Sequence, residues 1–264
     1  MSIKQYLAGI PLVRRLFIRL LKATARDVSL KNPWTGDRLA LNSFKHKGYW
    51  FFGKDRERLT MERFRRQIPA GATVLEVGGH IGFITQYFAQ LVGPAGKVVV
   101  FEPGSNNLPY IERNTAKLPQ VLIERQAVSD RAGEATFYED DITGQNNSLL
   151  DDYQGAAGVA QSHAMGVMKK ARTVRLTTLD AYIAAHGLKV DFIKIDIEGN
   201  ELNALRGAEK SLSRINALMI EVTEHQEEVA KLLRLAGYTL SDDKGEIMDT
   251  LGPTFGGNVF AIRD

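Results

Sequence analysis

Three charged side chains within one short apolar stretch are candidates for acid–base chemistry. Lys194, Asp196 and Glu198 occupy alternate positions of DFIKIDIEGNE, residues 191–201. Alternate residues of an extended segment point to the same side. A carboxylate held there can take the proton of a substrate hydroxyl while a second one orients the substrate. We interpret all three residues as catalytic candidates, and the structural alternative is a salt bridge between Lys194 and a neighbouring carboxylate.

A glycine-rich turn occurs earlier in the chain, in VLEVGGHIG at residues 74–82. Gly78 and Gly79 allow backbone conformations and a close ligand approach that a side chain would forbid, and Gly82 allows tight packing of the following helix. A dinucleotide site requires Gly-x-Gly-x-x-Gly, whereas here Glu76 stands two residues before the first glycine. A carboxylate repels a pyrophosphate but attracts the ammonium or sulfonium group of S-adenosylmethionine. The turn therefore favours S-adenosylmethionine as the cofactor.

A second carboxylate, Glu102, ends the apolar run KVVVFEP at residues 97–103. An acidic side chain at this place can accept hydrogen bonds from both ribose hydroxyls of an adenosine cofactor of either class. Only together with Glu76 and the glycine turn does it indicate one cofactor. The residues that we assign to cofactor binding are Glu76, Gly78, Gly79, His80, Gly82, Glu102, Pro103 and Asp196.

Further polar residues follow the next apolar run, ALMIEV at residues 217–222. Glu221, Glu224 and His225 could hold a substrate, act as a base or bind a divalent ion, since carboxylate and imidazole suit all three roles. A lone histidine in a polar segment is more often solvated or a helix cap, which applies to His225 and equally to His80 and His163.

The elements that would position these residues form an α/β pattern from Ala72 onward, in which β-branched runs alternate with helical periods. In a doubly wound sheet, ligands bind at the carboxyl ends of the strands, where the acidic residues lie. We therefore predict a doubly wound, seven-stranded Rossmann-like sheet. The expected strands are 73–77, 97–102, 121–126, 192–196 and 217–222, with an edge hairpin of 238–241 and 258–262, and the expected helices are 81–91, 106–117, 200–208 and 226–236.

The N-terminal part differs from the rest in charge. Residues 1–66 carry 16 basic and 5 acidic side chains, hence +11, while the remaining 18 basic and 26 acidic ones give −8. Residues 3–22 have an amphipathic, basic helical period, which either packs on the main domain or lies on an anionic membrane. The aromatic side chains of residues 31–66 either complete the core or line a substrate cleft. We predict an extension, 1–66, and a cofactor-binding domain, 67–264.

Composition and local sequence narrow the possibilities further. The chain has 264 residues, 44% of them hydrophobic, and no cysteine, which excludes disulfides, thiolate metal sites and cysteine nucleophiles. The longest uncharged run near the N-terminus is too short for a membrane span and no cleavage site follows it. We expect a cytoplasmic protein, peripheral at the membrane if residues 3–22 bind lipid. The segment of residues 144–170 is too long and too polar for an ordinary connection between two elements. It indicates a lid or insertion, and the alternative is a disordered linker.

Several of these segments together resemble the FkbM-type S-adenosylmethionine-dependent methyltransferases. The likeness covers just over half of the chain, most of 72–208 and more weakly to 222. It rests on VLEVGGHIGFIT, KVVVFEP, AVSDRAGEATFYED, Asn147-Ser148-Leu149, the TLD of residues 178–180 and DFIKIDIEGNELNALRGA. The last of these segments is the most specific for the family.

The resemblance implies O-methylation of a hydroxyl on a sugar, glycolipid or related secondary metabolite. It implies that Glu76, Gly78 and Gly82 surround the methionine part of the cofactor and that Glu102 holds the ribose. Asp196 and Glu198 would then face the methyl group and the acceptor. Candidates for substrate contact are Asn147, Ser148, Glu221 and His225. The chain departs from the family in having Glu76 where Asp is commoner, and Gly79-His80 where Ala-Asn is commoner.

Two other functions share parts of this pattern. A nicotinamide-dependent oxidoreductase or epimerase has a similar fold, but the glycine spacing differs and the chain contains no Tyr-x-x-x-Lys. A non-catalytic protein could keep the cofactor fold and dock to a membrane or partner through the basic extension. A nucleic-acid substrate is disfavoured because the acidic part of the chain would repel phosphate. We therefore expect a small-molecule, sugar or lipid-linked acceptor.

Overall fold

A computed structural model describes residues 11–140, 143–151 and 169–263, without the side chains of residues 11–15. The start of the expected helix 3–22, His163 and residues 152–168 of the expected insertion lie outside the described residues. The chain divides into two compact units, 1–56 and 57–264. This boundary lies before helix α4 (Arg58–Gln67), whereas the predicted boundary, between residues 66 and 67, falls at the last residue of that helix.

The first unit combines a helix, a hairpin and a short aromatic segment. Its elements are α2 (Pro11–Ala23), β1 (Asp27–Lys31), β2 (Arg38–Asn42), α3 (Lys47–Phe52) and a short 3-10 helix (Gly53–Asp55). Strands β1 and β2 are antiparallel over their whole length. The indole N–H of Trp50 donates to the Ser43 carbonyl at 2.9 Å, and the Arg56 guanidinium lies 4.5 Å from the Tyr49 ring centre. Cation–π and hydrogen-bond contacts thus accompany the aromatic side chains.

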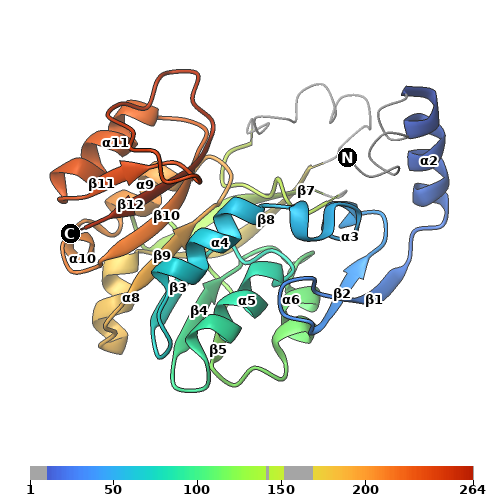
Figure 1. Cartoon of the computed structure of the whole chain (residues 1–264), viewed down its shortest axis with the longest axis horizontal. Helices are drawn as coiled ribbons and strands as arrows, with labels where there is room; N and C mark the ends of the chain where they lie inside the picture. The colour runs from blue at the N-terminus through green and yellow to red at the C-terminus, as the bar shows by residue number, and fades with distance from the viewer. Residues whose placement is uncertain (1–10, 141–142, 152–168, 264) are drawn as a thin grey trace. The chain divides into compact units, whose positions relative to one another are not determined.

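The second unit contains a seven-stranded sheet in the order β11-β12-β10-β9-β3-β4-β5 (Figure 1). The neighbouring strands β10, β9, β3, β4 and β5 run parallel to one another. Strand β12 is antiparallel to both β10 and β11. This confirms the predicted doubly wound fold and its terminal hairpin. The strands are β3 (Thr73–Val77), β4 (Lys97–Phe101), β5 (Val121–Glu124), β9 (Phe192–Ile195), β10 (Ala217–Val222), β11 (Thr239–Ser241) and β12 (Gly257–Ile262).

Successive side chains of a strand point to opposite faces of the sheet, and in these strands both sets are largely apolar. Helices therefore cover both faces of the sheet. On one face, Phe64 of α4 packs edge-on against Phe88 of α5 and Phe192 of β9, with ring centres 4.8 and 5.8 Å away. Helices α4 and α5 lie side by side on this face in Figure 1. On the other face, an aliphatic core that includes Ile193 joins the sheet to α8, α9 and α11. The helices are α5 (Phe83–Val92), α6 (Leu108–Thr115), α8 (Leu179–His186), α9 (Glu201–Arg206), α10 (Glu209–Leu212) and α11 (Gln226–Leu235).

A second, three-stranded sheet was not predicted. It has the order β6-β8-β7, with β6 (Ala127–Val128), β7 (Gly133–Asp140) and β8 (Lys169–Thr177). Strands β7 and β8 are antiparallel along their facing residues, from Gly133 opposite Leu176 to Asp140 opposite Lys169. Lys169 and Lys170, the last two residues of the expected 144–170 insertion, therefore belong to strand β8 instead.

Candidate active site

The glycine turn between β3 and α5 brings two chain segments into close contact. Gly78 has a φ of +92°, and a Cβ there would lie 1.9 Å from the Asp196 carbonyl oxygen. A Cβ on Gly79 would lie 2.3 Å from a Val100 methyl group, and Gly82 also has a positive φ, of +83°. Only glycine fits the first two positions without moving its neighbours. The turn therefore places the end of β3 directly against the end of β9.

Glu76, on the β3 strand just before this turn, is buried with 1% exposure. Neither of its carboxylate oxygens has a hydrogen-bond partner among the described residues. Burial raises the pKa of Glu76 to about 7, although Lys194 favours the charged form. A buried carboxylate without hydrogen bonds is costly, and an ammonium group would relieve that cost. The side chain thus fits the cationic end of S-adenosylmethionine.

Glu102, at the end of β4, is held by three hydrogen bonds from the chain. Its carboxylate accepts from the backbone N–H of His80 at 2.7 Å, from that of Gly104 at 2.8 Å and from the Asn107 side chain at 3.3 Å. Burial raises the pKa of Glu102 to about 7 despite the bonds from Gly104 and His80. The oxygen bonded to His80 has a second lone pair, so that a ribose hydroxyl can donate to it. The adjacent Pro103 is half-buried.

Lys194 and Asp196 form an ion pair at the carboxyl end of β9. The Lys194 ammonium lies 3.1 Å from the Asp196 carboxylate and donates to the Gly78 carbonyl, also at 3.1 Å. Burial alone would lower the pKa of Lys194, but Asp196 and Glu76 raise it above its usual value. Lys194 is therefore a buried cation that stays charged. Its contacts are those of the predicted structural alternative, and they tie the glycine turn to Asp196.

Three carboxylates converge beyond the ends of β9 and β10. Asp196, Glu198 and Glu221 each offer an oxygen within 4.8 Å of the other two, and all three side chains are half-buried. The negative charge of Asp196, followed by burial, raises the pKa of Glu221 to about 10. Like charges so close together cannot all be ionised without a large cost, so Glu221 keeps its proton at neutral pH. The closeness of the three carboxyl groups therefore favours the neutral form of Glu221.

The turn that carries Glu198 has a strained backbone. Glu198 has a φ of +58°, in the left-handed region that only glycine adopts freely, and the following Gly199 has a φ of +98°. The buried Glu201 carboxylate accepts from the backbone N–H groups of Ile197 at 3.1 Å and Gly199 at 3.0 Å. Glu201 was not among the predicted site residues. An acidic residue in the first turn of α9 is the signal that could have revealed it.

Residues 143–148, which we call the strap, contact both sides of this site. Beside Glu102, the His80 ring nitrogen Nε2 lies 3.1 Å from the Thr143 carbonyl, and the Asn107 side chain donates to the Gly144 carbonyl at 3.0 Å. On the other side, the Ser148 hydroxyl donates to the Glu198 carbonyl at 2.7 Å. The two predicted substrate candidates Asn147 and Ser148 are buried and bonded to the chain itself.

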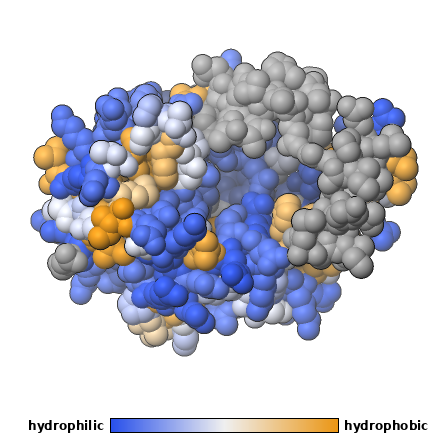
Figure 2. Space-filling view, turned by 45° about the horizontal axis from the view of Figure 1, so that its top comes forward, coloured by the Kyte–Doolittle hydropathy of each residue, from blue (hydrophilic) through white to orange (hydrophobic). Residues whose placement is uncertain are grey.

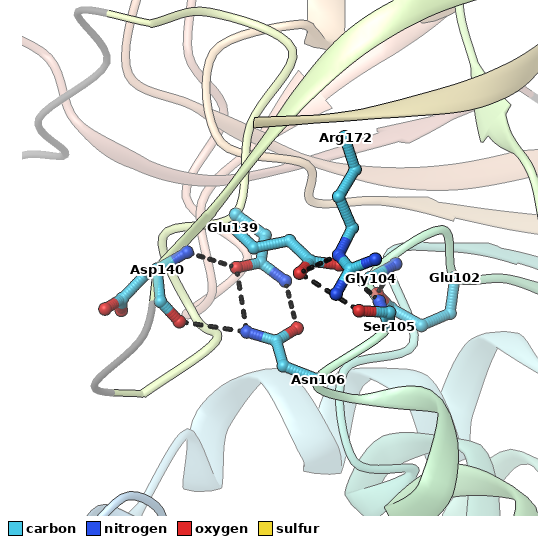
Figure 3. A network of polar contacts seen from close by, with 8 residues as sticks. Glu102, Gly104, Ser105, Asn106, Glu139, Asp140 and Arg172 are labelled. Carbon is cyan, nitrogen blue, oxygen red and sulfur yellow. Dashed lines mark hydrogen bonds and ion pairs between the residues drawn. The ribbon is translucent and has the colours of Figure 1, made fainter. Parts of the chain in front are cut away.

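A polar network anchors the strap to the loop after β4 (Figure 3). The Asn106 and Asn147 amides face each other, with the Asn147 nitrogen donating to the Asn106 oxygen at 2.8 Å. Glu139 accepts from the Ser105 backbone N–H at 2.6 Å and from Arg172 at 2.9 Å. Of these residues only Asn147 was among the predicted candidates, for substrate contact; Ser105, Asn106, Glu139 and Arg172 were not, because their partners are far away in the sequence.

The last predicted residue, His225, lies apart from these contacts as the cap before α11. The backbone of His225 has a φ of +55°. Its imidazole ring is half exposed and lies 3.8 Å from the Glu228 carboxylate. The His225 side chain makes no capping hydrogen bond to α11, so its exposure matches the solvated rather than the capping interpretation of a lone polar histidine. The described residues of the site thus place Glu76 and Glu102 at the ends of β3 and β4, and the three carboxylates beyond the ends of β9 and β10.

Comparison with known proteins identifies the domain. The family model for the methyltransferase FkbM domain matches residues 76–251, which include all the charged site residues described above. A solved structure of methyltransferase FkbM from Methylobacillus flagellatus KT is 14% identical, with a TM-score of 0.43, and covers 98% of this chain and 62% of that one.

Two curated relatives match this chain over only part of their own length. The AMB antimetabolite synthetase AmbE of Pseudomonas aeruginosa is 25% identical over 230 residues, which are 74% of this chain and 11% of that protein. The 2-O-methyltransferase NoeI of Sinorhizobium fredii is 23% identical over 159 residues, 58% of this chain and 64% of that protein. The chain therefore spans less than two thirds of the length of either relative.

Proposed function

The chain belongs to the FkbM methyltransferase family and is an S-adenosylmethionine-dependent methyltransferase, and on that premise we propose that it methylates a hydroxyl of a sugar, glycolipid or related secondary metabolite. The observation that carries this proposal is the convergence of Asp196, Glu198 and Glu221 within 4.8 Å, directly beside the glycine turn. A hydroxyl needs a base to become a good nucleophile, and this cluster supplies two carboxylates. The name of the relative NoeI, a 2-O-methyltransferase, supports the same chemistry.

The residues divide the work of the reaction between the two sides of the turn. S-adenosylmethionine supplies an activated methyl group, so that the protein mainly aligns the acceptor and removes a proton. Glu76 would hold the cationic amino acid end of the cofactor, and Glu102 its ribose. Asp196 or Glu198 takes the hydroxyl proton, while the other orients the acceptor. The raised pKa of Glu221 favours its neutral form, which avoids a third negative charge beside these two residues.

We also propose that the acceptor is reached at a membrane through α2. Leu16, Phe17 and Leu20 of this helix are 69%, 43% and 62% exposed, and the basic side chains Arg19 and Lys22 lie among them. Exposed apolar and basic groups on one helix suit an anionic lipid surface. None of the helices in the described part of the chain is long and apolar enough to cross a membrane.

The first experiment is calorimetric titration of the wild type and Glu102→Ala with S-adenosylhomocysteine and, in parallel, with NAD. We expect tight binding of S-adenosylhomocysteine that falls at least about tenfold in the variant, because a charged hydrogen-bond acceptor is lost. Binding of NAD alone would favour the oxidoreductase. The methyl acceptor is then sought with methyl-labelled S-adenosylmethionine and a mixture of glycolipids and oligosaccharides, and label found on nitrogen or carbon instead of oxygen would contradict O-methylation.

A further inference from the structure

The Ser148 hydroxyl occupies a place where a contact with substrate is excluded by its surroundings. The side chain is fully buried, with 0% exposure. Its hydroxyl donates to the Glu198 carbonyl at 2.7 Å and accepts from the Leu150 backbone N–H at 3.0 Å. The backbone of Ser148 exchanges two hydrogen bonds with Tyr138 of β7, at 2.8 and 3.1 Å. The single proton of the hydroxyl is therefore committed to Glu198.

The partner of this hydroxyl is the strained position of the acidic turn. Glu198 holds a φ of +58°, which costs free energy for a residue with a Cβ. From one direction the Glu201 carboxylate binds the N–H groups of Ile197 and Gly199. From the other direction Ser148 binds the carbonyl between them. The turn is thus held at the peptide unit of residues 196–197 and, from both directions, at that of residues 198–199.

We infer that Ser148 is a positioning residue, which fixes the backbone of Glu198 and thereby the direction of its carboxylate toward the acceptor. The inference rests on the proposed function in taking Glu198 as the acceptor-facing carboxylate. A strained backbone persists only when its surroundings determine it, and removal of one of its hydrogen bonds lets it relax. Because the strap also contacts the loop after Glu102 through Asn147, the position of Glu198 is set relative to the cofactor side.

Hydrogen exchange measured by mass spectrometry tests this inference without knowledge of the acceptor. In Ser148→Ala, we expect the amides of residues 196–200 to exchange about tenfold faster, the equivalent of one lost hydrogen bond. S-adenosylhomocysteine binding should change less than about twofold, because Glu76 and Glu102 keep their contacts. Ser148→Thr retains the hydroxyl and is expected to restore slow exchange.

Ser241→Ala is the matched control, since it removes another buried hydroxyl, one that accepts from Arg63 at 2.9 Å outside the strap and the acidic turn. Faster exchange of residues 196–200 in this control, or no change in Ser148→Ala, would overturn the positioning role. If Ser148→Ala does not fold, Ser148→Cys keeps a weak donor and is expected to exchange at an intermediate rate, and wild-type exchange there would contradict the inference. Failure of the proposed function would appear separately, as absent S-adenosylhomocysteine binding in the wild type.

Discussion

Two buried carboxylates, Glu76 and Glu102, are the residues that we propose bind the cofactor. Burial raises the pKa of each to about 7, so both change charge within the physiological range. The ammonium of S-adenosylhomocysteine and the donor hydroxyls of its ribose interact most strongly with the ionised forms. The affinity for the cofactor product should therefore depend on the protonation of these two side chains.

We predict that the affinity for S-adenosylhomocysteine increases as pH rises through about 7. Below that pH the carboxyl groups are protonated in the free protein and the attraction is lost, so binding at pH 6 should be at least about tenfold weaker than at pH 8. Calorimetric titrations across this range measure the effect, and Glu76→Gln should flatten the profile. Glu209→Gln, an exposed change on α10, is the control that keeps the wild-type slope. A flat wild-type profile would contradict the assignment.

The carboxylates on the acceptor side lead to a prediction about turnover. Asp196→Asn and Glu198→Gln each remove a negative oxygen while keeping the side-chain size, so the one that is the base should lower the methyl-transfer rate by about 10²–10⁴-fold. Loss of the other should mainly weaken acceptor binding. Single-turnover transfer of labelled methyl groups, beside S-adenosylhomocysteine affinity as a check of folding, separates these effects. Turnover unchanged in both variants would exclude both residues as the base.

Residue types alone predicted the charged centre of the site but not its support. Glu76, Glu102, Asp196 and Glu198 end strands, and strand ends can be recognised in a single sequence. The network of Asn106, Asn147, Glu139 and Arg172 joins segments more than thirty residues apart, and no local pattern indicates such pairs. The αL backbone of Glu198 was equally unpredictable, since it depends on hydrogen bonds to Ser148 and Glu201.

At the scale of elements, the β3 and β9 ends meet at Gly78. A Cβ at this position would lie 1.9 Å from a backbone oxygen, which cannot move without disturbing Asp196. Gly71 has a similar φ of +82° but nothing within 4 Å of its would-be Cβ. Substitution of Gly71 therefore adds only the strain of a positive φ, whereas substitution of Gly78 adds that strain and a steric clash.

We therefore predict that Gly71→Ala lowers the free energy of unfolding by about 1–2 kcal/mol, the cost of a left-handed alanine. Gly78→Ala carries the same cost plus the clash, and should lose S-adenosylhomocysteine binding or fail to fold. Urea unfolding and calorimetric titration of the two variants measure this difference. Equal stability and equal binding of the two variants would show that β3 and β9 do not meet as described.

The elements of the seven-stranded sheet were predictable because their apolar runs are strong, and the predicted boundaries differ from the observed ones by only a few residues. The three-stranded sheet was not, since β8 reads KKARTVRLT and has little apolar character. It forms through cross-strand pairs such as Glu139 with Arg172, 2.9 Å apart. Such a strand is stabilised by its neighbours more than by its own residues.

At the scale of the whole chain, charge separates the two ends of the sequence. The +11 balance of residues 1–66 contrasts with −8 for the remainder. Figure 2 shows apolar groups as separate areas on a largely hydrophilic face. The membrane contact that we propose therefore rests on the basic charge and the exposed leucines of α2.

We predict that the protein sediments with vesicles containing phosphatidylserine but not with vesicles of phosphatidylcholine alone, and that salt weakens the binding. Leu16→Glu combined with Leu20→Glu should reduce binding by about tenfold or more, because two apolar side chains no longer enter the lipid. Leu235→Glu, at a 79% exposed leucine of the second unit, is the matched control. Equal binding of both variants and the wild type would remove the role of α2.

The antiparallel pairing of β7 with β8 has a consequence for how this protein can be altered. Asp140 lies opposite Lys169, and the Lys169 ammonium donates to the Asp151 carbonyl, so residues 151 and 169 flank one point of the surface. The entropic contribution to the free energy of closing a loop increases only by about 0.6 kcal/mol for each doubling of the loop length. Because Asp151 and Lys169 are already in contact, segments of different length can be exchanged between these two residues at small entropic cost while the pairing of β7 with β8 is kept.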